Sequence, residues 1–201
     1  MSIKDAKLDF IVSIAKDLFL KNGVSVVTIK DIAVEAGVGE ATIYRYFSKK
    51  QNIVVAVALK LEEEILKKFF KLSKADTGYE KLSLFYNRFL EIFEKRKDYL
   101  KFISEFDSYF SNEKANLEDY EKGINSFYNV YIEAYNLGLE DKTIKEIENI
   151  NLFYQTTTHS LMGLCKKLAY EHEILNQDSK ILPKDEIICL INIILFNLKN
   201  L

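Results

Sequence analysis

Helix-breaking residues are scarce in this chain, and their scarcity limits the folds open to it. The 201 residues include one proline, Pro183, and seven glycines. Between them, apolar residues recur at intervals of three or four, and no window alternates cleanly with the period of two that marks a half-buried strand. Because few residues would interrupt them, such segments can form helices of many turns. The pattern predicts an all-α chain of about nine helices.

The composition favours a protein with a substantial core and no membrane span. With 48% hydrophobic residues, the chain can bury that core as one compact unit or as two small ones. Its start carries acidic residues and no small-residue cleavage site, so it does not resemble a signal peptide. The most apolar run, residues 187–196, is too short to cross a bilayer. Cys165 and Cys189 fit neither a metal spacing nor a disulfide framework, which indicates a reducing cytoplasm.

Charge is unevenly divided along the chain, whose formal net charge is −2. Residues 1–74 hold 13 Lys and Arg against 9 Asp and Glu, a net charge of +4, whereas the rest holds 15 against 21, a net charge of −6. A basic part attracts phosphate, and an acidic part is repelled by a DNA duplex. The division favours DNA binding by the amino-terminal part, although charged runs are more often simply solvated helix faces.

Residues 28–50 have the pattern of two short helices joined by a tight turn and followed by basic residues. Thr28 and Asp31 have the spacing of a capping box, which satisfies backbone donors at a helix start. Gly37 then favours a stop, because glycine readily takes the left-handed conformation that ends helices. The second short helix carries hydrogen-bonding and cationic side chains beside its apolar ones. Held by a small partner helix, such an element can enter a DNA major groove.

The remaining helices follow from apolar periodicity and from start signals. We expect them at residues 4–21, 49–71, 77–96, 98–109, 116–136, 143–173 and 183–198. Thr77 with Glu80 and Thr143 with Glu146 are further capping boxes that would open two of these helices. Pro183 suits the first turn of the last one.

Residues 8–57 resemble the amino-terminal domain of the tetracycline-repressor (TetR) family of bacterial transcriptional regulators, in an ordered set across three helices. The matching residues are Ile11, Ala15, Leu18, Phe19, Gly23, Thr28, Ile32, Ala33, Ala36, Gly37, Val38, Thr42, Ile43, Tyr44, Tyr46, Phe47 and Lys50. Beyond residue 75 the likeness is limited to length, number of helices and apolar final helices. The resemblance implies a DNA-binding domain at residues 1–48 and a ligand-binding and dimerisation domain at residues 49–201, connected by the helix at 49–71.

The resemblance also implies how the protein would act on DNA. A homodimer would read a palindromic operator with its two heads, and a small molecule in the carboxy-terminal domain would release the DNA. Along the groove would lie Lys30, Glu40, Ala41, Thr42, Tyr44 and Arg45, and phosphates would be held by Thr28, Tyr46 and Lys50. Hydroxyls and lysine suit phosphate oxygens, and a groove-facing arginine can bind guanine through two hydrogen bonds. Tyr44 and Tyr46 could equally cover the three-helix core with their rings.

Aromatic residues are concentrated in the central and later helices. At helical spacing such residues are more often core than pocket, but as a group they would suit a hydrophobic or flat aromatic ligand. We expect a cavity with few charges, lined by Phe89, Phe93, Phe127, Tyr131, Tyr154 and Thr157.

The last two helices have the features of a two-fold interface. The helix at 143–173 contains small residues that permit close approach, and the helix at 183–198 is apolar over more than one face. We expect the interface to involve Thr158, Met162, Cys165, Ala169, Ile187, Ile191, Ile194 and Leu198. The alternative is that the final helix is buried within its own chain.

No set of residues points to catalysis, a metal or a cofactor. The chain lacks a glycine-rich phosphate loop, a nucleophile elbow and paired metal ligands on a helix. We therefore expect a DNA-binding regulator, most simply a repressor, whose partners are duplex DNA, a small hydrophobic or aromatic effector and a second copy of the chain. The alternative is a helical interaction protein that has lost DNA binding and acts through a protein partner.

Overall fold

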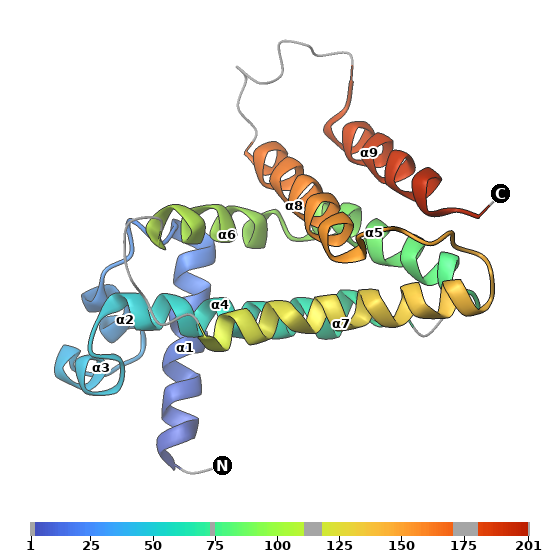
Figure 1. Ribbon diagram of the computed structural model, residues 1–201. Coiled ribbons are helices and arrows are strands. Elements are labelled where there is room, and N and C mark those ends of the chain that lie inside the picture. The colour runs from blue at the N-terminus through green and yellow to red at the C-terminus, as the bar shows by residue number, and fades with distance from the viewer. Residues whose placement is uncertain (1–2, 73–74, 111–117, 171–180, 201) are drawn as a thin grey trace. The chain divides into compact units, whose positions relative to one another are not determined.

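The computed structural model describes residues 3–72, 75–110, 118–170 and 181–200, and over these residues the elements are all helices, as expected (Figure 1). In the described part of the chain there are nine, namely α1 Ile3–Asn22, α2 Ile29–Glu35, α3 Glu40–Phe47, α4 Lys50–Phe69, α5 Gly78–Lys95, α6 Lys97–Phe110, α7 Glu118–Glu140, α8 Ile150–Ala169 and α9 Pro183–Leu198. Nowhere in the described ranges is a helix both long and apolar enough to cross a bilayer.

The chain forms two compact units. The first comprises Met1–Glu64 with Lys101–Gly123, and the second comprises Ile65–Leu100 with Ile124–Leu201. Three helices, α4, α6 and α7, therefore contribute residues to both units. The functional division expected between residues 48 and 49 is a different boundary, and it stays a prediction.

The first unit is organised around α1 to α3 and the first part of α4. Ile11, Ile32, Ile43 and Ile53, one from each of these helices, are completely buried. The expected capping box at the start of α2 is present, with the Asp31 N–H donating to the Thr28 hydroxyl and the Asp31 carboxylate accepting from the Thr28 N–H. A local start signal and a shared apolar core thus place the two short helices.

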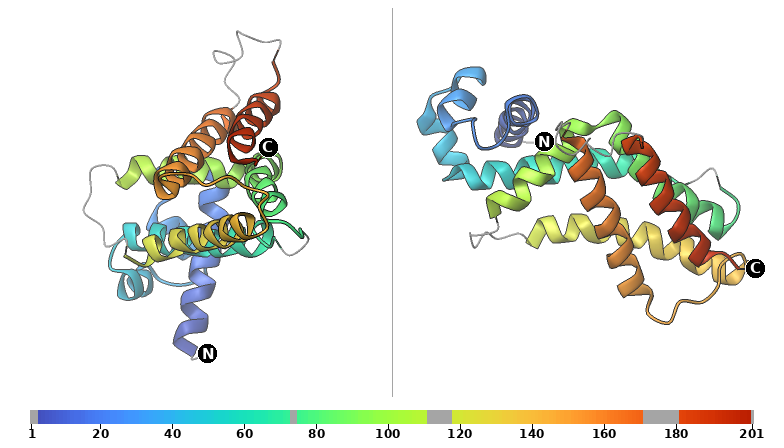
Figure 2. Two further views of the ribbon diagram at one scale, coloured as in Figure 1. Left: turned by 45° about the vertical axis from the view of Figure 1, so that its right-hand side comes forward. Right: turned by 90° about the horizontal axis from the view of Figure 1, so that it is seen from above.

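In the second unit α5, α8 and α9 pack against one another, as the two further views also show (Figure 2). The capping box of Thr77 and Glu80 opens α5 as expected. At the start of α5, Gly78 lies directly against the backbone of Gly138 in α7, where an added Cβ would collide with main-chain atoms. Two glycines therefore permit a close approach that larger residues would prevent.

Two helix boundaries differ from the sequence prediction. The expected capping box of Thr143 and Glu146 does not start a helix, because the Thr143 hydroxyl bonds to the Asp141 carboxylate and the Thr143 carbonyl accepts from Asn200. The helix α8 begins at Ile150 instead, where the Asn149 side chain accepts from the Leu152 N–H. Its expected end at residue 173 was also too late, since α8 ends at Ala169.

The expected end of α7 at residue 136 was too early. The helix continues through Gly138 to Glu140. In that position Gly138 provides the close contact with Gly78 described above. A glycine that suggested a helix end in the sequence serves here as a packing surface inside a helix.

Candidate nucleic-acid interface

The segment from Thr28 to Phe47 forms two short helices with a tight turn between them. Gly37 takes a φ of +63° in that turn, and the Val38 N–H donates to the Ala33 carbonyl at 3.0 Å. The next helix, α3, begins at Glu40, and its preceding residue, Gly39, provides no side-chain cap. Buried Ile43 attaches α3 to the core of the first unit. The opposite face of α3 is left for solvent or for a partner.

Five of the six residues expected along the groove lie on α3, and four of them are on its free face. Glu40, Ala41, Tyr44 and Arg45 are exposed, and Thr42 is half-buried. Tyr44 keeps 49% of its surface exposed, so its ring does not simply cover the core. A short helix with exposed hydroxyl, carboxylate and cationic groups on one face can reach base edges in a major groove.

Tyr46 and Arg45 contact each other. The guanidinium carbon of Arg45 lies 5.2 Å from the ring centroid of Tyr46, which is half-buried. Such a cation–π contact steadies the guanidinium without using its hydrogen-bond donors. Arg45 is therefore held in place and still able to donate to a base or a phosphate.

The start of α2 holds two more of the expected residues. Lys30 is exposed, whereas the hydroxyl of Thr28 donates to Asp31 Oδ2 at 2.6 Å. The hydrogen bond from the Thr28 side chain is the largest of the influences that lower the pKa of Asp31. Thr28 thus has a local structural task that its hydroxyl performs whether or not a phosphate is near.

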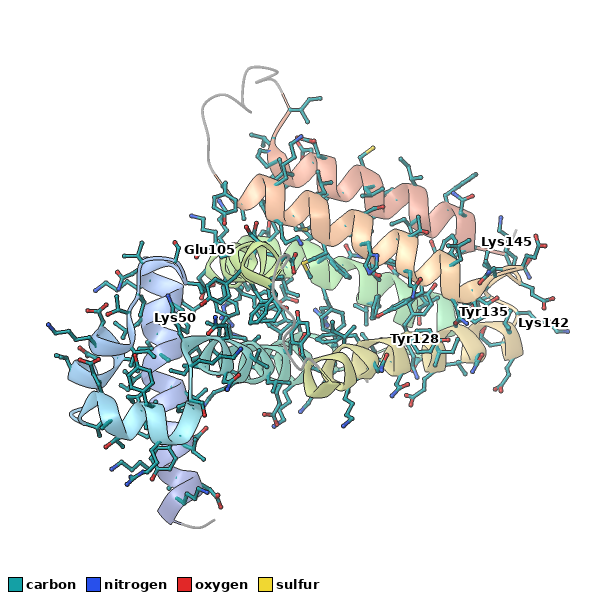
Figure 3. All side chains as sticks on the ribbon, turned by 60° about the vertical axis from the view of Figure 1, so that its left-hand side comes forward. Lys50, Glu105, Tyr128, Tyr135, Lys142 and Lys145 are labelled. Carbon is teal, nitrogen blue, oxygen red and sulfur yellow. The ribbon has the colours of Figure 1, made fainter. Side chains whose placement is uncertain are left out.

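Lys50 is more enclosed than expected of a phosphate ligand. Its ammonium donates to the Val24 carbonyl at 2.5 Å and lies 5.8 Å from the centroid of the Tyr109 ring (Figure 3). Burial lowers the pKa of Lys50, and the negative charges of Glu105 and Asp31 act in the opposite direction. To bind a phosphate, this ammonium would have to exchange the Val24 carbonyl for the phosphate oxygen.

Glu105 was missed by the sequence analysis. From α6 its carboxylate accepts the N–H of Val24 at 2.5 Å and that of Ser25 at 3.4 Å, just after α1. The same carboxylate lies against Gly23, whose φ is +88°. Glu105 accepts hydrogen bonds from the backbone of this short loop, and Lys50 donates one to it, so both side chains hold the loop in place. No local sequence pattern could reveal the contact between Glu105 and Val24, because these two residues are 81 positions apart.

Five of the six residues expected to line an effector cavity meet in an aromatic cluster of the second unit. Phe89 and Phe127 contact the ring of Phe70 at centroid distances of 6.2 and 5.0 Å, and Tyr154 contacts Tyr131 at 4.9 Å. The sixth, Phe93, is buried under the ammonium of Lys97. Phe70, Phe85 and Tyr86 belong to the same cluster and were missed. We call the following residues the aromatic cluster: Phe70, Phe85, Tyr86, Phe89, Phe127, Tyr131, Tyr154 and Thr157.

Hydroxyl groups form the polar centre of the aromatic cluster. The hydroxyls of Tyr86 and Thr157 are 2.9 Å apart, and Tyr86 donates to the Tyr131 hydroxyl at 3.5 Å. Burial raises the pKa of Tyr86 to about 12 and also raises that of Tyr131. All three groups therefore remain neutral at physiological pH. Neutral hydroxyls among rings suit an uncharged or weakly polar ligand portion.

Comparison with known proteins bears first on α1 to α3, which we call the head. The model of the family described as bacterial regulatory proteins, tetR family, matches residues 11–57, a range that contains α2 and α3. Many solved structures of regulators in that family share the fold of the chain over nearly its whole length. Residues 11–57 belong to the TetR family. Members of the family are transcriptional regulators rather than enzymes, and DNA binding by this regulator follows from the family head.

Three solved structures illustrate how far the fold of the chain is shared. A transcriptional regulator from Saccharomonospora viridis, in complex with choline, has a TM-score of 0.77 and 16% identity, covering 98% of this chain and 100% of its own. The fatty acid degradation regulator of Bacillus halodurans has 0.66 and 18%, covering 94% of both chains. A ketosteroid transcriptional regulator of Mycobacterium tuberculosis has 0.60 and 13%, covering 100% and 98%. No curated protein matches the chain.

The residues expected at the dimer interface are packed within the second unit of the single chain. Cys165, Ala169, Ile187, Ile191, Ile194 and Leu198 are buried within the single chain, as is Thr158, and Met162 is half-buried. Their place in a dimer stays a prediction. The exposed apolar side chains lie on the outer faces of the two helices, at Leu152 in α8 and at Ile188, Ile193 and Phe196 in α9.

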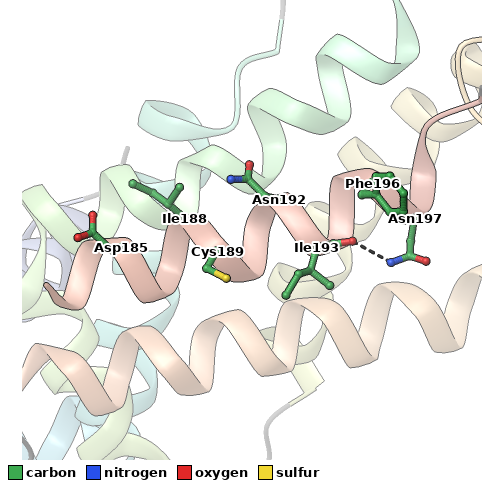
Figure 4. A pocket seen from close by; sticks show the side chains of 7 residues that line it. All are labelled: Asp185, Ile188, Cys189, Asn192, Ile193, Phe196 and Asn197. Carbon is green, nitrogen blue, oxygen red and sulfur yellow. Dashed lines mark hydrogen bonds between the residues drawn. The ribbon is translucent and has the colours of Figure 1, made fainter. Parts of the chain in front are cut away.

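A shallow hollow accompanies the outer face of α9. It has a volume of about 510 Å³ and is lined by Asp185, Ile188, Cys189, Asn192, Ile193, Phe196 and Asn197 (Figure 4). Phe196 keeps 74% of its surface exposed. Among the described residues, no group of three or more His, Cys, Asp and Glu side chains is placed to hold a metal.

Proposed function

We propose that this regulator is a repressor that binds a palindromic operator as a homodimer and releases it when a small hydrophobic or aromatic effector binds. The observation that carries the proposal is the free face of α3, where Glu40, Ala41, Tyr44 and Arg45 are all exposed. Residues 1–48 act as the DNA-binding domain and residues 49–201 bind the effector and the second copy, with α4 connecting the two functions. The protein works beside the chromosome, in the cytoplasm.

The experiment on DNA binding starts from selection of duplexes out of a random pool. Affinity for the selected site is then measured by fluorescence anisotropy at two salt concentrations for the wild type, for Tyr44→Ala and for Lys145→Ala. The matched surface control, Lys145, is exposed in the loop before α8. We expect Tyr44→Ala to weaken binding and Lys145→Ala to leave it unchanged. Selection that enriches no sequence, or enriched sites without two-fold symmetry, would contradict the operator proposal.

The alternative function, a helical interaction protein acting through a protein partner, gives a different result in the same assay. Such a protein would bind duplex DNA weakly and without sequence preference. The exposed Arg45, steadied by Tyr46 and with its donors free to point outward, favours the DNA reading.

Dimerisation is proposed through the outer faces of α8 and α9, with a second copy of the chain as the occupant. Large apolar side chains exposed together on one face mark a contact surface, and Phe196 is the most exposed of them at 74%. A two-fold contact repeats the same patch on both copies, so one substitution changes it twice. Two linked heads are also what a palindromic site requires.

The test of the dimer is sedimentation of Phe196→Glu at micromolar concentration. We expect the wild type to sediment as a dimer and the variant as a monomer, because the variant places two buried charges in the contact. The control is Ile124→Glu on α7, which changes an exposed apolar residue on a helix other than α8 and α9. A wild type that sediments as a monomer would overturn the homodimer.

The effector is proposed to enter the aromatic cluster. Tyr131 is completely buried and its ring touches those of Phe85, Tyr86 and Tyr154, so a ligand has to separate these rings to bind. Binding and rearrangement are then the same event, as release of DNA requires. Moving the population from mostly bound to mostly released takes a preference of about 10⁴-fold for the released form.

Effector sensing is tested by adding graded hydrophobic and aromatic compounds to the complex with the selected duplex. We expect at least one to release the DNA from the wild type and to do so far less from Tyr154→Ala. The control is Tyr79→Ala, because Tyr79 lies on α5 outside the aromatic cluster, near Lys199. Choline, which the similar protein from Saccharomonospora viridis binds, serves as a comparison compound. Failure of every compound to release the duplex would end the effector proposal.

A further inference from the structure

A carboxyl group is buried in the first unit, and no cation from the described residues is paired with it. Glu62 of α4 has 5% of its surface exposed, and among the residues that the structure describes its Oε2 atom has no hydrogen-bond partner. Buried polar atoms in native proteins are nearly always paired, so an unpaired carboxyl oxygen calls for a cause. Neither the DNA-binding face nor the aromatic cluster uses this residue.

The beginning of α7 closes over the Glu62 carboxyl. Tyr120 hydrogen-bonds to it, which leaves Oε2 as the unpaired oxygen. The ring of Tyr120 stacks at 4.8 Å from that of Phe106 in α6. Gly123 covers Oε2 directly, since a Cβ built on Gly123 would lie 2.6 Å from it. One helical turn of α7 therefore depends on the state of this carboxyl.

The described charged groups near Glu62 are either paired with other residues or exposed. On α4, Lys60 bonds to Asp9 at 2.5 Å and Glu64 bonds to Lys16 at 2.7 Å, both on α1. On α6, Glu105 accepts from the loop after α1, and Asp107 is exposed. Lys122, which precedes Gly123 on α7, is exposed as well. So is Glu63, which follows Glu62 on α4. None of these charges acts on the carboxyl: burial raises the pKa of Glu62 to about 8, and the hydrogen bond from Tyr120 acts in the opposite direction.

A buried carboxyl of this kind must be neutralised, by a cation or by a proton. An ionised carboxylate without a partner is too costly to keep in an apolar site. A metal ion or an organic ammonium needs room beside the oxygen, and Gly123 lies so close to Oε2 that even a Cβ built on it would come within 2.6 Å. A proton needs no extra space. The geometry therefore selects the proton.

We propose that Glu62 is a proton-operated switch in which the neutral carboxyl lets the turn at residues 120–123 pack on α4 and ionisation drives that turn away. The sign follows from linkage. A carboxyl that holds its proton more tightly in the packed state than when exposed stabilises that state fully below about pH 4.5, and this stabilisation is lost as the pH rises through about 8. The proposal concerns packing within the first unit and does not depend on DNA binding.

The first measurement is the titration of the Glu62 carboxyl carbon by ¹³C NMR in the intact protein. Its signal is identified by its absence from Glu62→Gln. We expect a midpoint near 8, against 4.5 for an exposed glutamate. A midpoint at the ordinary value would overturn the proposal, and so would a midpoint that moves with the concentration of sodium or ammonium, because a cation would then be the occupant.

The second measurement is the melting temperature at about pH 6 and about pH 9. The neutral isostere Glu62→Gln keeps the shape of the side chain and cannot ionise. We expect the Tm of the wild type to fall by about 5 °C or more relative to that variant over this interval. The control, Glu63→Gln, removes an exposed neighbouring charge and should follow the wild type. Parallel curves for the wild type and Glu62→Gln would show that ionisation of Glu62 does not drive the change, which also overturns the switch.

Discussion

The helix-turn-helix segment and the aromatic cluster are built from contacts of very different range. The turn between α2 and α3 is closed by bonds such as that from the Val38 N–H to the Ala33 carbonyl, five residues apart. In the aromatic cluster the hydroxyls of Tyr86 and Thr157 meet across 71 residues. Short-range contacts leave a signature that can be read in order along the chain, whereas long-range contacts appear as isolated aromatic residues in separate helices.

The difference extends to how each region presents its side chains. The head exposes Tyr44 and Arg45 on a helix held by two buried apolar residues, and the aromatic cluster hides Tyr131 and Tyr86 completely. Substitutions in the head should therefore change binding with little loss of stability. Substitutions in the second unit, which we call the body, should change stability first, because its interior is closely packed.

The largest effect is expected at the contact between α5 and α7. Gly78→Ala places a Cβ on the backbone of Gly138, which cannot move aside as a side chain would. We expect a loss of about 3 kcal/mol in the free energy of unfolding, at the upper end for overpacking. Denaturant titration measures it. A loss below that of an ordinary surface substitution would mean that the body tolerates separation of these helices, and the contrast with the head would fail.

Arg45→Ala tests whether a substitution in the head changes DNA binding without changing stability. If the guanidinium binds guanine, its removal should cost about 1–3 kcal/mol of discrimination between the selected site and one with that base pair changed. Unfolding free energy should hardly change, because Arg45 is exposed. Competition binding with the two duplexes gives the discrimination, and Lys145→Ala is the control of equal charge. Equal loss on both duplexes would reassign Arg45 to a phosphate.

The two capping boxes allow a matched pair of substitutions in the two regions. Thr28→Ala and Thr77→Ala each remove a side-chain oxygen that accepts an N–H three residues later. Each should lower the free energy of unfolding by about 1 kcal/mol, since the motif is the same. Only Thr28→Ala is expected to weaken operator binding as well. If both variants bind the operator as tightly as the wild type, Thr28 acts in α2 alone.

The smallest effect is expected at Gly163 on α8, and it has the opposite sign. Gly163 is exposed and an added Cβ meets open space. Gly163→Ala should raise the free energy of unfolding by roughly 0.5–1 kcal/mol, the usual difference in helix propensity. Sedimentation of the same variant reports on the dimer. A weakened dimer would place this small residue inside the two-fold contact, where the second copy leaves no room for a methyl group.

A good part of the head could be predicted from the chain alone. Thr28, Asp31 and Gly37 mark helix boundaries through the conformations and caps that these residue types favour, and the structure confirms all three. Four of the residues expected to face the groove share one side of α3, because positions 40 and 44, and 41 and 45, lie one helical turn apart. The state of Lys50 could not be predicted, since its partner loop is fixed by Glu105 from a distant helix.

Sequence by itself determined the helical class, most helix starts and the α2–α3 head, because those depend on backbone preferences and contacts within a few residues. Tertiary structure decided what the pattern left ambiguous. It turned Ile191 and Ile194 of α9 inward and Phe196 outward, it used Gly138 as a packing surface, and it kept Thr143 out of α8. Those outcomes depend on which apolar face finds a partner, and on which polar group finds a nearer acceptor, once distant segments have come together.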